Sequence, residues 1–105
     1  MTRSAGAELK RALRRPFARF AGRAETHDLV SRPWSSVTFS GERHRLTLRI
    51  DGAGAAAAAD VFLDGLSDRE FELHGHIMAD IAVVEDVREG NCVRLTLEAL
   101  TVAAN

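Results

Sequence analysis

The chain has 105 residues, of which 46% are hydrophobic and 28% are charged, and its formal net charge at pH 7 is −1. This length allows one small domain with a single core, and the composition excludes an intrinsically disordered chain. The single cysteine, Cys92, cannot close an internal disulfide. A lone cysteine is typical of a reducing compartment, so we expect a cytoplasmic location. No apolar run approaches the roughly 20 residues that a membrane-spanning helix needs.

The charge is divided unevenly along the chain. Residues 1–24 carry seven Lys and Arg side chains against one acidic side chain, Glu8, whereas residues 25–105 carry seven Arg against fourteen Asp and Glu. Such an asymmetry indicates a basic segment that contacts something anionic. We therefore divide the chain into a basic amphipathic helical arm, residues 1–24, and one small α+β domain, residues 25–105. The acidic domain of the same chain is one candidate partner for the arm.

The first predicted element is a basic amphipathic helix in AELKRALRRPFARFAGRA, residues 7–24. Its apolar side chains recur at helical spacing, and its basic side chains lie mostly off that stripe. Pro16 lacks an N–H, so we expect it to divide the helix near Arg15. We favour packing of the apolar stripe on the domain over binding to nucleic acid or a membrane surface at residues 3–23. The candidate anion-binding residues are Lys10, Arg11, Arg14, Arg15 and Arg19.

A change to period-two patterning predicts a first hairpin after Trp34. Its two strands are WSSVTF, residues 34–39, and a second run that ends near residue 51. A four-residue loop between them would place Val37 and Phe39 on the same side as the apolar residues of the second strand. This pairing predicts that His44 faces the core.

A second helix is predicted in GAGAAAAADVFLDGL, residues 52–66. Alanine has high helix propensity, and Gly65 is a plausible terminator. The opening glycines match the form of a dinucleotide fingerprint, but the acidic residue that should follow is not in place, so we expect no cofactor. The predicted buried stripe is Ala55, Ala58, Ala59, Phe62 and Leu66.

The second hairpin, residues 70–102, has the clearest alternation. A three-residue loop, Glu89-Gly90-Asn91, would match the apolar faces of its two strands. The predicted cross-strand pairs are Val83 with Leu97, Asp86 with Arg94 and Val87 with Val93. The complete order of helix, hairpin, helix, hairpin predicts the α+β class, with an antiparallel sheet of about four strands and helices packed on one face.

Two histidines separated by a single residue, His74 and His76, raise the question of a metal site. Side chains two apart on a strand point the same way, so both rings could ligate zinc, with Glu72 and Asp80 as further ligands. The sequence offers no third His or Cys nearby, and Gly75 between the two histidines could mark a bulge. We therefore favour a solvated strand face over a metal centre. The chain has no recognised catalytic motif, and we predict that it is not an enzyme.

Apolar residues on the outer face of the second hairpin predict a covered surface. The cover is either the N-terminal helix or a second copy of the chain. We expect a protein that acts by association, as a homodimer through the 70–102 hairpin. The alternatives are an anionic partner bound through residues 3–23 and metal-dependent activity at the two histidines. The predicted interface residues are Met78, Ala82, Val84, Leu100 and Val102.

Overall fold

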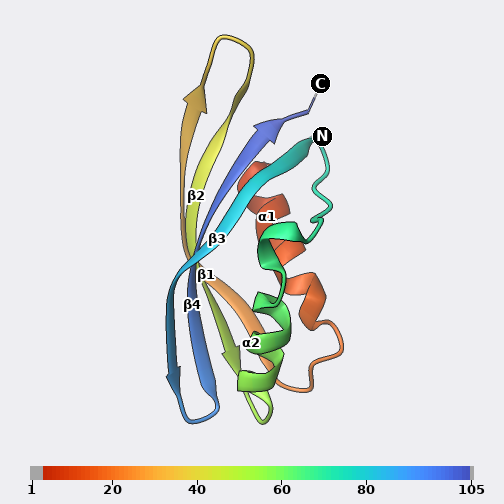
Figure 1. Ribbon diagram of the computed structural model, residues 1–105, viewed down its shortest axis with the longest axis vertical. Helices are drawn as coiled ribbons and strands as arrows, with labels where there is room; N and C mark the ends of the chain where they lie inside the picture. The colour runs from red at the N-terminus through yellow and green to blue at the C-terminus, as the bar shows by residue number, and fades with distance from the viewer. Residues whose placement is uncertain (1–3, 105) are drawn as a thin grey trace.

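The computed structural model describes residues 4–104 and contains two α-helices and a four-stranded antiparallel sheet of order β1-β2-β4-β3. The α+β class and the antiparallel sheet are confirmed. Both helices lie on the same side of the sheet, and the β1–β2 hairpin extends past the ends of its neighbours (Figure 1). None of the described helices has the length and hydrophobicity that crossing a bilayer requires. The elements in chain order are α1 (Ala5–Arg14), η1 (Arg15–Phe17), β1 (Arg23–Ser35), β2 (Ser40–Asp51), α2 (Ala55–Leu63), η2 (Leu66–Asp68), β3 (His76–Glu89) and β4 (Cys92–Ala103).

The first helix, α1, is shorter than the predicted arm. It begins after Ser4, whose hydroxyl accepts a hydrogen bond from the backbone N–H of Ala7 at 3.1 Å. It ends at Arg14, because Pro16 favours the tighter 3-10 turn η1 that follows. That turn brings Phe17 into the core. The last two residues of the predicted arm already belong to β1.

The second helix, α2, packs its alanine stripe toward the sheet. Ala55, Ala59 and Phe62 are buried, and the Phe62 ring lies 5.3 Å from the Phe17 ring, centroid to centroid. Small side chains let the helix axis approach the strands closely. Gly65 follows the helix with a φ of 67°, a left-handed conformation that glycine adopts without strain.

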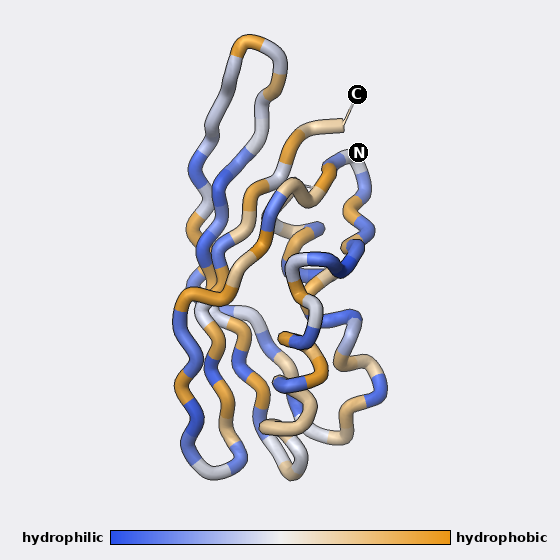
Figure 2. The backbone as a smooth tube through the Cα atoms, viewed as in Figure 1, coloured by the Kyte–Doolittle hydropathy of each residue, from blue (hydrophilic) through white to orange (hydrophobic). Residues whose placement is uncertain are grey.

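The core lies between the two helices and one face of the sheet. β2 and β4 alternate buried and exposed side chains, and the alternation of apolar and polar residues is visible along the strands in Figure 2. Burial of one such aliphatic side chain contributes about 1.5–3 kcal/mol relative to its exposure. The fully buried large side chains of these strands and helices include Leu9, Leu13, Leu46, Leu48, Ile50, Phe62, Val93, Leu95 and Leu97.

The first hairpin differs from its prediction. Its first strand is β1, residues 23–35, and the turn falls at residues 36–39. Val37 and Phe39 therefore lie in the turn and are exposed, rather than packed against β2. His44 does face the core, as predicted, but its cross-strand neighbour on β1 is Ser31 instead of an apolar residue.

The second hairpin has a two-residue turn, Gly90-Asn91, in place of the predicted three-residue loop. Glu89 pairs with Cys92, so Val87 lies opposite Arg94 and the predicted Asp86–Arg94 pair does not form. An irregularity in the register between Val83 and Glu85 inserts one residue into β3. This β-bulge restores the predicted pairing of Val83 with Leu97. A second bulge lies between Met78 and Asp80.

The packing of α1 predicts that Leu13→Ala destabilises the whole domain. Leu13 is fully buried among core residues, so we expect a loss of about 2–5 kcal/mol in the free energy of unfolding. Urea unfolding monitored by circular dichroism measures this loss. Arg14→Ala, on the exposed side of the same helix, is the control and should change stability by less than about 0.5 kcal/mol. A Leu13→Ala protein as stable as this control would show that the helix is not part of the cooperative unit.

Candidate functional site

The candidate site is the face of the sheet opposite the helices, which we call the open face. Cross-strand pairing arranges its side chains in rows that cross β1, β2, β4 and β3 in that order. The rows, in sequence along the strands, are Arg32–Arg43–Leu100–Asp80, Val30–Arg45–Glu98–Ala82, His27–Thr47–Thr96–Glu85, Glu25–Arg49–Arg94–Val87 and Arg23–Asp51–Cys92–Glu89. A sixth row, Trp34–Gly41–Val102–Ile77, lies next to the first of these at the far end of the face.

The first two rows line a shallow groove of about 510 Å³. Val30, Ala82 and Leu100 supply its apolar part, and arginine and carboxylate side chains surround them. Val30 is 54% exposed. Ile77, which pairs with Val102 beside the groove, is 57% exposed. An apolar surface with a charged border is typical of a protein–protein interface.

Charge on the open face is divided between the two hairpins. The β1–β2 half carries mostly arginines, and the β3–β4 half carries mostly carboxylates. One ion pair joins the halves, Arg45 to Glu98 at 3.3 Å, and another lies within the basic half, Arg49 to Asp51 at 2.8 Å. The charged residues of the first row are Arg32, Arg43 and Asp80, which take part in neither pair.

Arg32 and Arg43 lie directly opposite each other on neighbouring strands. Within residues 4–104, no ion pair or hydrogen bond involves either guanidinium, or the carboxylates of Asp80 and Glu85. Like charges in direct cross-strand pairs are destabilising. The open face therefore presents unpaired charges of both signs on its two sides.

The structure places three of the five predicted interface residues together on the open face, namely Ala82, Leu100 and Val102. Met78 lies on the other face, where it packs against the core, because β3 changes phase at the bulge that follows. Val84 lies in the bulge between Val83 and Glu85 and is 46% exposed. Sequence reasoning missed two residues of this surface. The alternation assigned Ile77 to the core, and Val30 lay outside every predicted strand.

The four predicted metal ligands do not form one ligand set in this fold. β3 begins only at His76, and the backbone turns at Gly75 with a φ of 81°, so the two histidines are not alternate residues of one strand. Asp80 belongs to the open face, and the Glu72 carboxylate pairs with Arg15 of η1. In the described part of the chain, no three His, Cys, Asp or Glu side chains form a group that could hold a metal ion.

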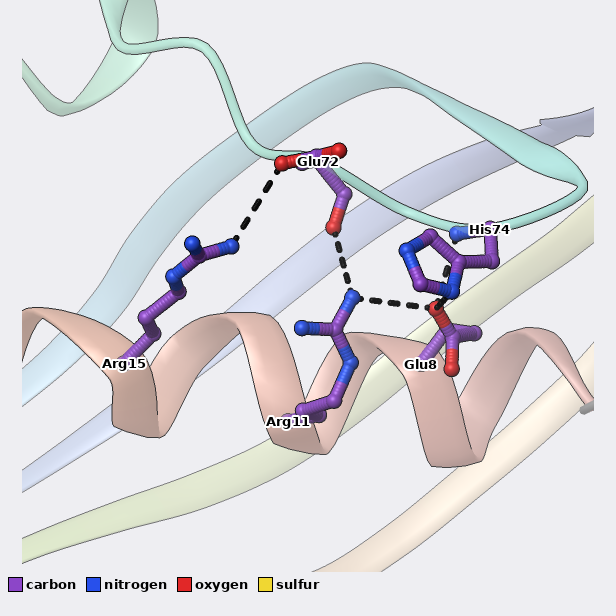
Figure 3. Close-up of polar contacts among 5 residues, drawn as sticks. All are labelled: Glu8, Arg11, Arg15, Glu72 and His74. Atoms are coloured by element: carbon purple, nitrogen blue, oxygen red, sulfur yellow. Dashed lines mark hydrogen bonds and ion pairs between the residues drawn. The ribbon is translucent and has the colours of Figure 1, made fainter.

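His74 and Glu72 instead help to hold the segment before β3 against α1 (Figure 3). The carboxylate of Glu8, which is fully buried, accepts a hydrogen bond from the backbone N–H of His74 at 2.7 Å and one from Arg11 at 3.1 Å. Arg11 also donates to the backbone carbonyl of Glu72 at 3.1 Å, and Arg15 pairs with the Glu72 carboxylate at 3.4 Å. A buried carboxylate with such partners fixes the position of this loop.

The five candidate anion-binding residues, which lie on α1 and in the turn that follows it, divide into two groups. Arg11 donates to the backbone carbonyl of Glu72 and Arg15 pairs with the Glu72 carboxylate, so both contact the acidic part of the same chain that the charge asymmetry offered as one candidate. Arg14 and Arg19 are exposed, and Lys10 is half-buried. Of these five residues, only the second group lacks an ion pair within residues 4–104.

A buried polar cluster joins β1, β2 and β4 at His44, which is 2% exposed. Its Nδ1 lies 2.7 Å from the Ser31 hydroxyl and its Nε2 lies 2.9 Å from the Thr101 hydroxyl. Thr101 donates its own proton to a backbone carbonyl, which assigns the ring proton to Nε2. Burial is the main cause that lowers the pKa of His44. The second partner is a hydroxyl instead of the carboxylate of an acyl-transfer triad, so the cluster fits a structural role.

Cys92 lies beside Asp51 on the open face. A hydrogen bond to the Asp51 carboxylate, together with burial, raises the pKa of the thiol. A protonated thiol is a poor nucleophile. This position gives no support to a catalytic cysteine.

No protein-family model matches the chain, and no curated protein matches its sequence. The chain is similar in fold to a chain of a solved structure described as "Virion of native gene transfer agent (GTA) particle". The TM-score is 0.59, and the alignment covers 96% of this chain and 98% of that chain at 18% sequence identity. Similarity at this level of identity establishes the fold alone.

The buried cluster predicts a pH dependence of stability. Because the folded pKa of His44 lies below its ordinary value of 6.5, the unfolded chain takes up a proton first as the pH falls. The stabilisation is complete above about pH 6.5 and declines as the pH falls toward the folded pKa. His44→Gln does not titrate, so its stability deficit relative to the unmodified protein should shrink between about pH 7.5 and about pH 5.5. Urea unfolding at both pH values tests this, and a constant deficit would contradict it.

Proposed function

We propose that the protein is a non-enzymatic subunit that acts by association, and that its partner is a second copy of the same chain bound at the open face. The observation that carries the proposal is the uncovered apolar surface around Leu100. Two covers were expected for this surface, the N-terminal helix or another copy. α1 packs into the core on the opposite side of the sheet, so a second copy is favoured.

The edges of the sheet favour association through the face instead of through strand addition. β3 is an edge strand, and its two bulges interrupt the regular row of backbone groups that a new strand would need. The other edge strand, β1, contains Pro33 and a bulge at Asp28, whose φ is 56°. Bulges and proline are the usual protection of edges against pairing.

The comparison with known structures supports the same class of function. The similar chain is recorded in the virion of a gene transfer agent particle. We infer that this protein likewise serves as a structural subunit of an assembly. A cytoplasmic location remains a proposal that rests on the single cysteine.

The proposal predicts that Leu100→Arg converts a dimer into a monomer. A charge within the apolar surface opposes its burial against a second copy. Light scattering on a sizing column should give twice the 11.4 kDa of one chain for the unmodified protein at both low and high salt, and the single-chain mass for Leu100→Arg. The matched control is Val61→Arg, because Val61 is 70% exposed on α2. A monomeric unmodified protein, or a dimeric Leu100→Arg protein, would refute association through this surface.

A second candidate function is binding of an anionic partner through the basic segment, residues 3–23. The observation in its favour is the exposure of Arg14 and Arg19. Deletion of the helix is not a usable test, because Leu9 and Leu13 belong to the core.

This second candidate predicts that Arg14→Glu/Arg19→Glu abolishes binding to anionic vesicles or to a DNA duplex without changing the molar mass of the protein. The reversal replaces attraction to phosphate by repulsion, and binding by the unmodified protein should weaken steeply with salt. Vesicle co-sedimentation and a DNA mobility shift measure the two cases. Equal binding by both proteins, or none by either, would exclude the helix as the binding element.

A further inference from the structure

We propose that two copies pack face to face about a two-fold axis that runs parallel to the strands, between β2 and β4, so that the basic half of each open face covers the acidic half of the other. This inference deepens the proposed function and rests on it, because it specifies how the second copy binds. The pairing registers of the four strands carry the argument.

Rotation about this two-fold axis places each row of one open face over the same row of the second copy, with the strand order reversed. In the first row, Arg32 of one copy then lies over Asp80 of the other, and the symmetry makes this contact twice. These two side chains are without a partner of opposite charge within the described chain. The reversed row also places Arg43 over Leu100, next to the same carboxylate.

The neighbouring rows match in the same way. In the second row, Val30 lies over Ala82 and the arginine of β2 lies over Glu98. The third row places His27 over Glu85 and one threonine over another. The fourth row gains no favourable contact, because it places Arg49 of one copy over Arg94 of the other. The apolar contacts of Val30 with Ala82 therefore form over the outer strands, and Arg45 and Glu98 meet between them.

Another orientation of the axis lacks this complementarity. An axis in the plane of the sheet but perpendicular to the strands would place each strand over its own copy. β1 and β2 would then lie over a second β1 and β2, and the unpaired arginines would meet the arginine-rich half of the partner. Like charges brought together across an interface cost several kcal/mol, so the parallel axis is favoured.

The open face is large enough for such a dimer. Four strands spaced about 4.8 Å apart and six rows about 6.8 Å apart give a face on the order of 700 Å² per copy. Two such faces bury on the order of 1,400 Å², within the range of stable protein–protein interfaces. Packed sheets whose strands are aligned to within about 30° are a common arrangement.

The test uses two charge reversals that are each expected to prevent self-association. Arg32→Asp places a carboxylate over Asp80 of the second copy, and Asp80→Arg places a guanidinium over Arg32. Each variant alone should raise the dissociation constant of the dimer at least about tenfold at low ionic strength. An equimolar mixture should recover dimers, because both contacts then pair opposite charges. Arg14→Asp, on α1, is the control and should associate as the unmodified protein does.

Analytical ultracentrifugation of the single variants, their mixture and the double variant Arg32→Asp/Asp80→Arg measures these effects. Recovery in the mixture and in the double variant supports the proposed axis. If the unmodified protein dimerises but both single variants do so equally well, or their mixture does not recover, this arrangement is refuted while association stands. If the unmodified protein is a monomer, both the arrangement and the proposed function fail. Circular dichroism confirms that each variant is folded, and both substituted positions are exposed.

Discussion

Burial of one face of the two central strands is the constraint on which the rest of the structure depends. Successive side chains of a strand point to opposite faces, so burial of Leu46 and Leu48 beneath the helices assigns Arg45 and the other odd-numbered residues of β2 to the open face. A slip of one residue would expose the leucines and bury charge, which the hydrophobic effect opposes strongly. The arrangement of charge on the open face is therefore fixed by the core.

β3 obeys this constraint only in part, because two bulges change its phase. After the bulge between Val83 and Glu85, Asp86 and Arg88 lie on the helix side, and Arg88 pairs with Asp60 of α2 at 2.8 Å. Hydrogen bonds to Asp86, which has the larger effect, and to Asp60 raise the pKa of Arg88. The guanidinium thus stays charged and ties the edge strand to the helix. The same bulges leave the backbone edge irregular, so β3 contributes its side chains, and not its edge, to an interface.

Periodicity in the sequence was sufficient to predict the second helix, the alternation of the central strands and the α+β class. It could not predict β1, because this edge strand is mostly polar on both faces and its alternation is broken at Asp28. His74 and His76 do not share one strand face, because a turn at Gly75 replaces the extended backbone that the alternation implied. Met78 was assigned to the wrong face because no residue type marks a bulge. The rows of the open face depend on registers, and registers depend on those bulges.

The two kinds of residue on the open face would contribute differently to an assembly. Exposed ion pairs contribute about 0–1 kcal/mol each, so the arginines and carboxylates cannot supply most of the affinity. The apolar residues around Leu100 supply affinity but are compatible with several orientations. The unpaired Arg32 and Asp80, at opposite ends of one row, distinguish these orientations, because only reversal of the row brings them together. Each two-fold contact occurs twice, so a small preference per pair is doubled in the dimer.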